Sequence, residues 1–164
     1  MSARRDDRTT TVVPVRARDG REINLHHVTQ RGGSPRGPVL LVHGAGVRAD
    51  VFRPPEATTI VDALLDEGHD VWLENWRASI DLPPTQWYLD DAARHDHPAA
   101  VDAVLAHTGA DSMQAIVHCQ GSTSFVMAAV AGLVPGVRTI VSNAVSLHPV
   151  IPPPSVFKLS LIHI

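Results

Sequence analysis

One residue of the sequence stands where a nucleophile would be well placed. Cys119, the only cysteine of the 164 residues, follows the apolar stretch 113–117 and comes directly before a helix-like stretch, 120–133. A strand that turns sharply into a helix presents the residue at the turn on the edge of the sheet. The N-terminus of the helix favours a thiolate there. The position therefore predicts a thiol that attacks a carbonyl carbon.

The turn places demands on its neighbours, because the backbone must fold tightly around it. Gly121, two residues after Cys119, meets this demand, whereas Val117, two residues before, replaces the glycine that is usual there. A different interpretation makes Cys119 a small buried hydrophobe, the commonest fate of a free cysteine. Ser122 is a competing nucleophile, but its place in the first turn of the helix predicts a local helix contact or a solvated hydroxyl.

Acyl transfer also needs hydrogen-bond donors for the oxyanion that develops on the substrate. The glycines of His43-Gly44-Ala45-Gly46 follow a short apolar stretch and let the backbone turn its N–H groups inward. We expect the N–H groups of Ala45 and Gln120 to be the two donors. The alternative is an ordinary glycine turn.

The elements around these residues alternate between short apolar strands and helices. Strands are expected at 11–17, 23–29, 38–43, 70–73, 113–117 and 137–142, and helices at 56–67, 98–107 and 120–133. Asp19-Gly20 predicts a hairpin between the first two strands. Gly68 and Gly109 should end the first two helices, and Asp96 should cap the second. The pattern predicts an α/β fold, a mostly parallel sheet with helices on both faces.

Composition and residue spacing limit the binding partners and the cellular compartment that can be expected. The net charge of −3 gives no reason to expect a nucleic-acid partner. We expect no metal site, because the pairs His26/His27 and His95/His97 are badly spaced for ligands. No apolar run approaches the ~18 residues of a membrane span, and the polar N-terminus does not look like a secretory signal. These features, with one cysteine, predict a cytoplasmic protein.

Four motifs in order resemble α/β-hydrolases, and within them the acid-lipase-like branch. They are residues 41–45, 68–77, 91–109 and 117–123, and the match spans roughly residues 20–148. The sharp turn between the strand and the helix at Cys119 corresponds to the nucleophile elbow of this family. A cysteine at the elbow departs from the serine of that branch and resembles polyhydroxyalkanoate synthases and dienelactone hydrolases. The resemblance implies Cys119 as nucleophile and Ala45 and Gln120 as the oxyanion hole. The supporting positions it implies are His43, Gly44, Gly46, His118 and Gly121.

The resemblance also implies an acid and a histidine after the elbow, and neither can be assigned. The last carboxylate side chain is Asp111. Of the two later histidines, His148 comes too early for the family pattern and His163 lies in residues 159–164, which look like read-through of a sequencing adapter. We therefore expect a disordered tail at 1–10, the N-terminal portion of an α/β-hydrolase domain at 11–158, and a non-native tail at 159–164.

Three functions are compatible with this sequence. The first is hydrolysis of an apolar or lipid-like ester through Cys119, and the second is acyl transfer of the polyhydroxyalkanoate-synthase kind. The third is a non-catalytic binding module with the hydrolase fold. None of the three requires a cofactor. For these 164 residues alone we expect no turnover, because no residue can be assigned as the base or the acid that would activate Cys119.

Overall fold

The computed structural model describes residues 8–147, and the predicted tail at 159–164 lies outside them. The strands are β1 (Arg8–Arg16), β2 (Glu22–Gln30), β3 (Pro38–Val42), β4 (Asp70–Asn75), β5 (Met113–His118) and β6 (Val137–Asn143). The helical segments are the 3₁₀ helix η2 (Ala49–Phe52), α1 (Ile60–Asp66), α2 (Leu89–Asp91), the π-helical turn η3 (Ala92–Asp96), α3 (His97–Thr108) and α4 (Gln120–Val130).

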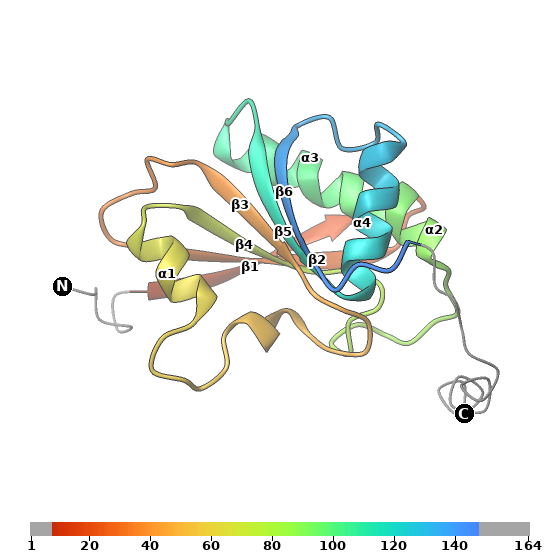
Figure 1. Cartoon of the computed structure of the whole chain (residues 1–164), viewed down its shortest axis with the longest axis horizontal. Helices are drawn as coiled ribbons and strands as arrows, with labels where there is room; N and C mark the ends of the chain where they lie inside the picture. The colour runs from red at the N-terminus through yellow and green to blue at the C-terminus, as the bar shows by residue number, and fades with distance from the viewer. Residues whose placement is uncertain (1–7, 148–164) are drawn as a thin grey trace.

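The six strands form one sheet in the order β1-β2-β4-β3-β5-β6 (Figure 1). The four strands β4, β3, β5 and β6 are parallel, and β1 and β2 add an antiparallel hairpin at one edge. Parallel neighbours end at the same edge of the sheet, so the residues after β3 and β5 meet there. The predicted α/β fold and the hairpin around Asp19-Gly20 are confirmed.

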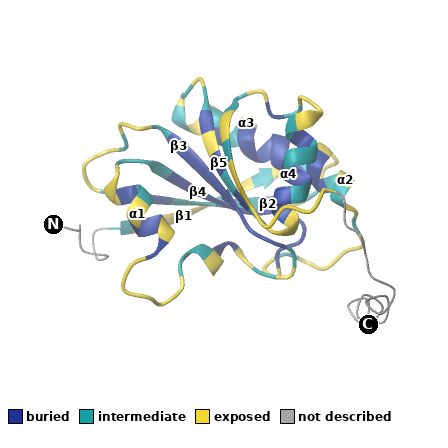
Figure 2. Cartoon of the chain, in the orientation of Figure 1, coloured by how far each residue is buried: buried dark blue, intermediate teal, exposed yellow. Residues whose placement is uncertain are grey.

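Helices cover both faces of the sheet, and each face has its own apolar core. On one face α3 and α4 pack against the sheet through a cluster that includes Trp76, Val104 and Phe125. On the other face α1 packs through a cluster that includes Val61 and Leu65. The central strands β3 and β4 are almost entirely buried and the edge strands β1 and β6 are largely exposed (Figure 2).

Several predicted boundaries were wrong. Residues 8–10, expected in the tail, belong to β1, while residues 1–7 lie outside the described part. The helix expected at 56–67 begins only at Ile60, because Thr59 and Asp62 form a capping box at its start. The helix expected to reach residue 133 ends at Val130, and Gly132 takes a left-handed conformation just after it. The left-handed glycines Gly68 and Gly109 do end their helices as predicted.

At the edge of the sheet away from Cys119, Asp70 joins two aromatic rings. Its carboxylate lies 2.6 Å from His27 Nε2 and accepts a hydrogen bond from Trp72 Nε1 at 2.8 Å, while the two rings stack 3.8 Å apart. Burial raises the pKa of Asp70, but the hydrogen bonds from His27 and Trp72 outweigh it and hold that pKa below the usual 3.8.

This depressed pKa predicts a specific loss of stability in acid. A carboxylate with a lower pKa in the folded than in the unfolded protein stabilises the fold above pH 3.8, and this contribution disappears as the pH falls through the folded pKa. Urea denaturation at intervals between pH 5 and pH 3 should show a steeper decline for the native chain than for Asp70→Asn. Asp102→Asn, which alters an exposed carboxylate paired with Arg18, should keep the native slope. Equal slopes for the native chain and Asp70→Asn would contradict the prediction.

Candidate active site

Cys119 lies at a strained turn between β5 and α4. Its φ of 55° and ψ of −128° lie outside the regions that side-chain-bearing residues usually adopt. The turn is held on both sides: the Cys119 N–H donates to Asn143 O of β6 at 2.9 Å, and Cys119 O accepts from Ser122 N at 3.0 Å. The thiol is exposed, which contradicts the interpretation of Cys119 as a buried hydrophobe. Backbone strain of this kind occurs where the surrounding structure enforces it, often at functional sites.

Gly121 allows α4 to approach the end of β3 more closely than any other residue would. A Cβ atom on Gly121 would lie 2.2 Å from His43 O and 3.0 Å from Val42 Cγ1. His43 O also accepts a hydrogen bond from Trp76 Nε1 at 2.9 Å, so this carbonyl is fixed from a second side. The start of α4 and the loop after β3 are therefore in close contact at Gly121, as the tight turn requires.

The loop His43-Gly44-Ala45-Gly46 lies directly against Cys119. A Cβ on Gly44 would come within 2.9 Å of Cys119 Cβ and 3.4 Å of its Sγ. Gly46 takes a φ of 73°, and its N–H donates to Ala78 O, which joins the loop to the segment after β4. Among residues 8–147, the N–H groups of Ala45 and Gln120 have no backbone acceptor. The loop and the elbow turn thus lie beside the same thiol.

His43 and His118 flank this arrangement from the ends of β3 and β5. Burial lowers the pKa of His43 to about 4, although a contact of 2.5 Å between its Nδ1 and Gly44 O opposes the shift. Its side chain is fully buried and uncharged at neutral pH, so it brings no positive charge to the site. His118 is partly exposed and lies opposite Asn143 in the register of β5 and β6. Neither imidazole has a hydrogen bond to the Cys119 thiol within the described part of the chain.

Ser122, the competing nucleophile, is neither solvated nor a local helix contact. It is fully buried, and its hydroxyl donates to Asn143 O at 2.8 Å. The same carbonyl accepts the Cys119 N–H. Ser122 therefore helps to attach the elbow to β6, and a buried hydroxyl in this position does not reach a substrate.

Asp96 was expected to cap a helix, and this prediction was wrong. The carboxylate makes no capping bond; it binds Arg77, accepting from its backbone N–H and Nε at 2.9 Å each and from Nη2 at 2.7 Å. Arg77 Nη2 also donates to Asp19 in the hairpin turn at 2.8 Å. Burial lowers the pKa of Arg77, but these two carboxylates outweigh it and raise that pKa overall. This network fixes the segment after β4, which in turn holds Gly46.

A second buried set of polar groups escaped the sequence analysis. Glu74 in β4, His97 in α3 and Ser124 in α4 are all fully buried and are joined by hydrogen bonds. The predicted strand 70–73 stops one residue before Glu74, whereas β4 extends through Glu74 to Asn75. Since Lys, Arg, Asp and Glu are rarely buried unless paired, a carboxylate that continues an apolar strand indicates a buried partner.

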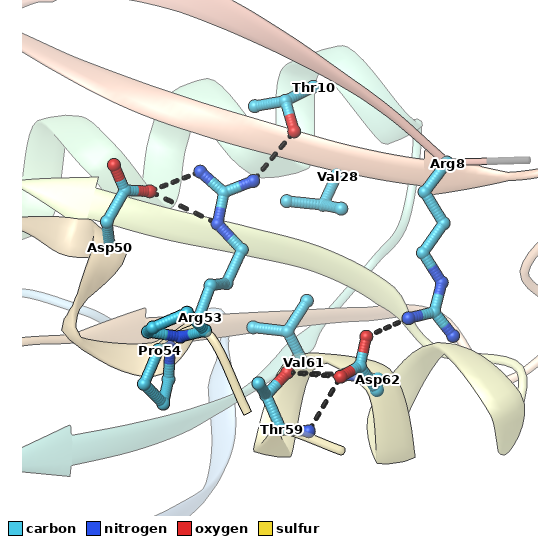
Figure 3. Close-up of a pocket in the computed structure, with 10 residues that line it drawn as sticks. Arg8, Thr10, Val28, Asp50, Arg53, Pro54, Thr59, Val61 and Asp62 are labelled. Atoms are coloured by element: carbon cyan, nitrogen blue, oxygen red, sulfur yellow. Dashed lines mark hydrogen bonds and ion pairs between the residues drawn. The ribbon is translucent and has the colours of Figure 1, made fainter. Parts of the chain in front are cut away.

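One surface pocket is lined by residues other than Cys119. It lies between β1, η2 and α1 (Figure 3). Its arginines already have partners: Arg53 binds Asp50 and Thr10, and Arg8 of β1 reaches Asp62 of α1. These contacts attach the first strand to the helix and explain why β1 extends to Arg8. We therefore interpret the pocket as a structural junction.

Residues 8–147 contain neither a cluster of metal ligands nor a membrane-spanning helix. No group of three or more His, Cys, Asp and Glu side chains there is arranged to hold a metal ion. Within the same range, every helix is too short or too polar to cross a membrane.

Comparisons with known proteins agree with this geometry. Residues 37–162 match the model of the family described as alpha/beta hydrolase fold. Sterol esterase 2 of Saccharomyces cerevisiae is 27% identical over 135 residues, which cover 72% of this chain and 25% of the esterase. The poly(3-hydroxyalkanoate) polymerase subunit PhaC of Haloarcula marismortui is 31% identical over 90 residues, 55% of this chain and 19% of the polymerase.

The fold has solved counterparts as well. The Pyrococcus furiosus esterase Pf2001 superposes with a TM-score of 0.60 at 18% identity, over 79% of this chain and 48% of that esterase. The chain spans about a quarter of the length of the yeast sterol esterase and less than half of Pf2001. A family match over most of the sequence, together with the sheet order and the strained elbow, shows that the chain belongs to the α/β-hydrolase fold family.

Proposed function

We propose that this chain carries the nucleophile and the oxyanion hole of an ester hydrolase in which Cys119 is the nucleophile. The observation that carries the proposal is the exposed Cys119 at a φ of 55°, with Gly44 of the facing loop against its Cβ and Sγ. In the proposed site the N–H groups of Ala45 and Gln120, which have no backbone acceptor among residues 8–147, would donate to the substrate oxygen as it develops negative charge.

The reaction would proceed in two steps. The Cys119 thiol gives up its proton as its sulfur attacks the ester carbonyl carbon and a C–S bond forms; the C–O bond then breaks, and the alkoxide leaves as an alcohol by taking up a proton, equivalent to the one that the thiol lost. Water then attacks the thioester, releases the carboxylic acid and returns the proton to sulfur. The N-terminus of α4 would stabilise the negative charge that develops on the substrate oxygen. We assign no residue of this sequence to the acid or the histidine that would complete the site.

The names of the relatives support an apolar ester as the substrate class. They include a yeast sterol esterase and a Drosophila melanogaster protein named lipase 1, 31% identical over 146 residues. Both are much longer than this chain, which covers 25% and 33% of them. The activity of any longer protein that contains this chain is therefore also a proposal.

Acyl transfer is the second candidate, and the cysteine favours it. A thiol suits the passage of acyl groups between thioesters, and the matched archaeal relative is named a poly(3-hydroxyalkanoate) polymerase subunit. In this variant of the mechanism a hydroxyl or thiol acceptor replaces water in the second step. Release of CoA from an acyl-CoA with transfer to an added acceptor, and no free acid, would favour this candidate over hydrolysis.

Acylation of Cys119 tests the proposal on the chain itself, without a need for turnover. p-Nitrophenyl butyrate should release p-nitrophenol in a burst of at most one equivalent and leave a butyryl group on the Cys119 peptide. The folded chain should react about a hundredfold faster than the same chain in urea, because only the folded state has the oxyanion hole. The burst should be absent in Cys119→Ala.

Other results would contradict the proposal. Equal acylation rates for folded and unfolded chain would mean that no oxyanion hole assists the thiol. If iodoacetamide also alkylated Cys119 no faster than a free thiol, the fold would be a non-catalytic module, the third function compatible with the sequence.

A further inference from the structure

Three buried side chains connect β4 to the first turn of the elbow helix. The Glu74 carboxylate lies 2.9 and 3.1 Å from His97 Nδ1, and His97 Nε2 lies 2.7 Å from Ser124 Oγ. Ser124 Oγ in turn lies 3.2 Å from Gln120 O and 3.4 Å from Gly121 O. This set of hydrogen bonds therefore ends on the carbonyl groups of Gln120 and Gly121, which lie one and two residues after Cys119.

The direction of these hydrogen bonds follows from the charge of the buried pair. Glu74 and His97 are both fully buried, and a net charge in such a place is costly. A net-neutral pair holds one proton between Glu74 and His97 Nδ1 and a second on Nε2, which then donates to Ser124. The Ser124 hydroxyl keeps its own hydrogen for the carbonyls of Gln120 and Gly121. The pair can be a charged Glu74 with a charged His97, or both residues can be neutral. In either state His97 Nε2 carries a hydrogen and donates it to Ser124 Oγ.

These residues have the composition of a Ser–His–Glu catalytic triad, but they do not act as one. All three are inaccessible to solvent, so a substrate cannot reach Ser124. The His97 ring is also enclosed by Trp76 and Phe125, at ring-centroid distances of 5.5 and 5.3 Å. Any contribution of the set to the reaction has to pass through the backbone that Ser124 holds.

The same end of β4 holds the other half of the site. Trp76, two residues after Glu74, donates its indole N–H to His43 O at 2.9 Å, and His43 precedes the glycine loop. Glu74 acts on the elbow through His97 and Ser124, and Trp76 acts on the facing loop. One short segment therefore sets the separation between the two N–H groups that would bind the oxyanion.

We propose that Glu74, His97 and Ser124 form a positioning chain that fixes the first turn of α4 and thereby aims the Gln120 N–H at the oxyanion. The catalytic meaning of this chain rests on the proposed function of Cys119. The three residues touch neither substrate nor thiol in this proposal. They act on the orientation of a backbone group.

Comparison of two reactions of Cys119 in Ser124→Ala tests the proposal. Acylation by p-nitrophenyl butyrate needs the oxyanion donors, whereas alkylation by iodoacetamide needs only the thiolate. Loss of one buried hydrogen bond should lower the acylation rate about tenfold relative to the alkylation rate. Because an unfolded chain is still alkylated but loses the assisted acylation, the folded fraction of each variant is measured by circular dichroism and both rates are compared per folded chain.

Two further variants sharpen the test. Thr108→Ala removes a comparable bond from a helical hydroxyl to the backbone, 2.8 Å to Val104 O in α3, and should keep the native ratio. Glu74→Gln should reduce the ratio in the native background but not in the Ser124→Ala background, because its effect passes through Ser124. An unchanged ratio in Ser124→Ala, or fully additive effects in the double variant, would overturn the proposal.

Hydrogen exchange separates this proposal from the function of Cys119. The N–H groups of Ser122 and Thr123 bond to Cys119 O at 3.0 and 3.4 Å, so their protection reports the order of the first turn directly. We expect Ser124→Ala to reduce it about tenfold and Thr108→Ala to leave it unchanged. Native protection in Ser124→Ala would refute positioning. A native chain that is never acylated would refute only the hydrolase proposal, and exchange would still decide the role of Ser124.

Discussion

Replacement of Asp96 by alanine should lower the free energy of unfolding by about 3–5 kcal/mol, because it leaves a buried charge without its main partner. Asp96 is fully buried and satisfies three donors of Arg77, the backbone N–H, Nε and Nη2. The Arg77 side chain is only 5% exposed, so water cannot replace the lost carboxylate. Asp19 would remain as a partner of Nη2, and Asp91 would remain 3.9 Å from Nη1.

Urea denaturation followed by circular dichroism measures this loss. Asp102→Ala is a suitable control, since Asp102 is exposed and forms a surface ion pair with Arg18, and such a pair contributes about 0–1 kcal/mol. A loss below about 1 kcal/mol in Asp96→Ala would mean that Arg77 finds water or another carboxylate, and that the network does not hold the segment after β4.

Gly121→Ala should disrupt the site more than any other single methyl group added to it. The new Cβ would lie 2.2 Å from His43 O, a backbone atom that Trp76 also holds in place. Either α4 or the end of β3 has to move, at a cost of about 1–3 kcal/mol. A shift of about 1 Å between the nucleophile and its donors can lower the acylation rate about a hundredfold.

The matched control for this variant is Gly136→Ala. There the new Cβ would lie 2.4 Å from Leu105 Cδ1, the end of a flexible side chain that can rotate away. Burst acylation of Cys119 should therefore stay close to native in Gly136→Ala and fall sharply in Gly121→Ala. Equal acylation of the two variants would show that the closeness of Gly121 and His43 is not needed for the reaction.

The local features of the site could be predicted because neighbouring residues determine them. The turn at Cys119 and the close approach at Gly121 depend on a few consecutive residues. The start of α1 differs from the prediction although Thr59 and Asp62 are only three residues apart, because the capping box begins the helix at Ile60 while the helical pattern already begins at residue 56. Val117 looked too large for its position, yet it is fully buried and packs in the core with Val42 and Phe125.

The buried polar groups could not be predicted, because their partners are distant in sequence. Asp96 has the residue type and position of a helix cap, and only the folded sheet brings Arg77 to it. Glu74, His97 and Ser124 come from three different elements, so no spacing rule connects them. Tertiary contacts of this kind override local preference whenever a charged group has to be paired in the core.

The position of β5 between β3 and β6 also determines when this site can exist during folding. The glycine loop after β3 and the turn at Cys119 are distant in sequence and meet only when β5 pairs with β3. Pairing of such separated strands is slow compared with closure of the β1–β2 hairpin, because a long loop must first be closed. We therefore expect the proposed acylation of Cys119 to appear late in refolding, and its rate of appearance would report when the centre of the sheet is complete.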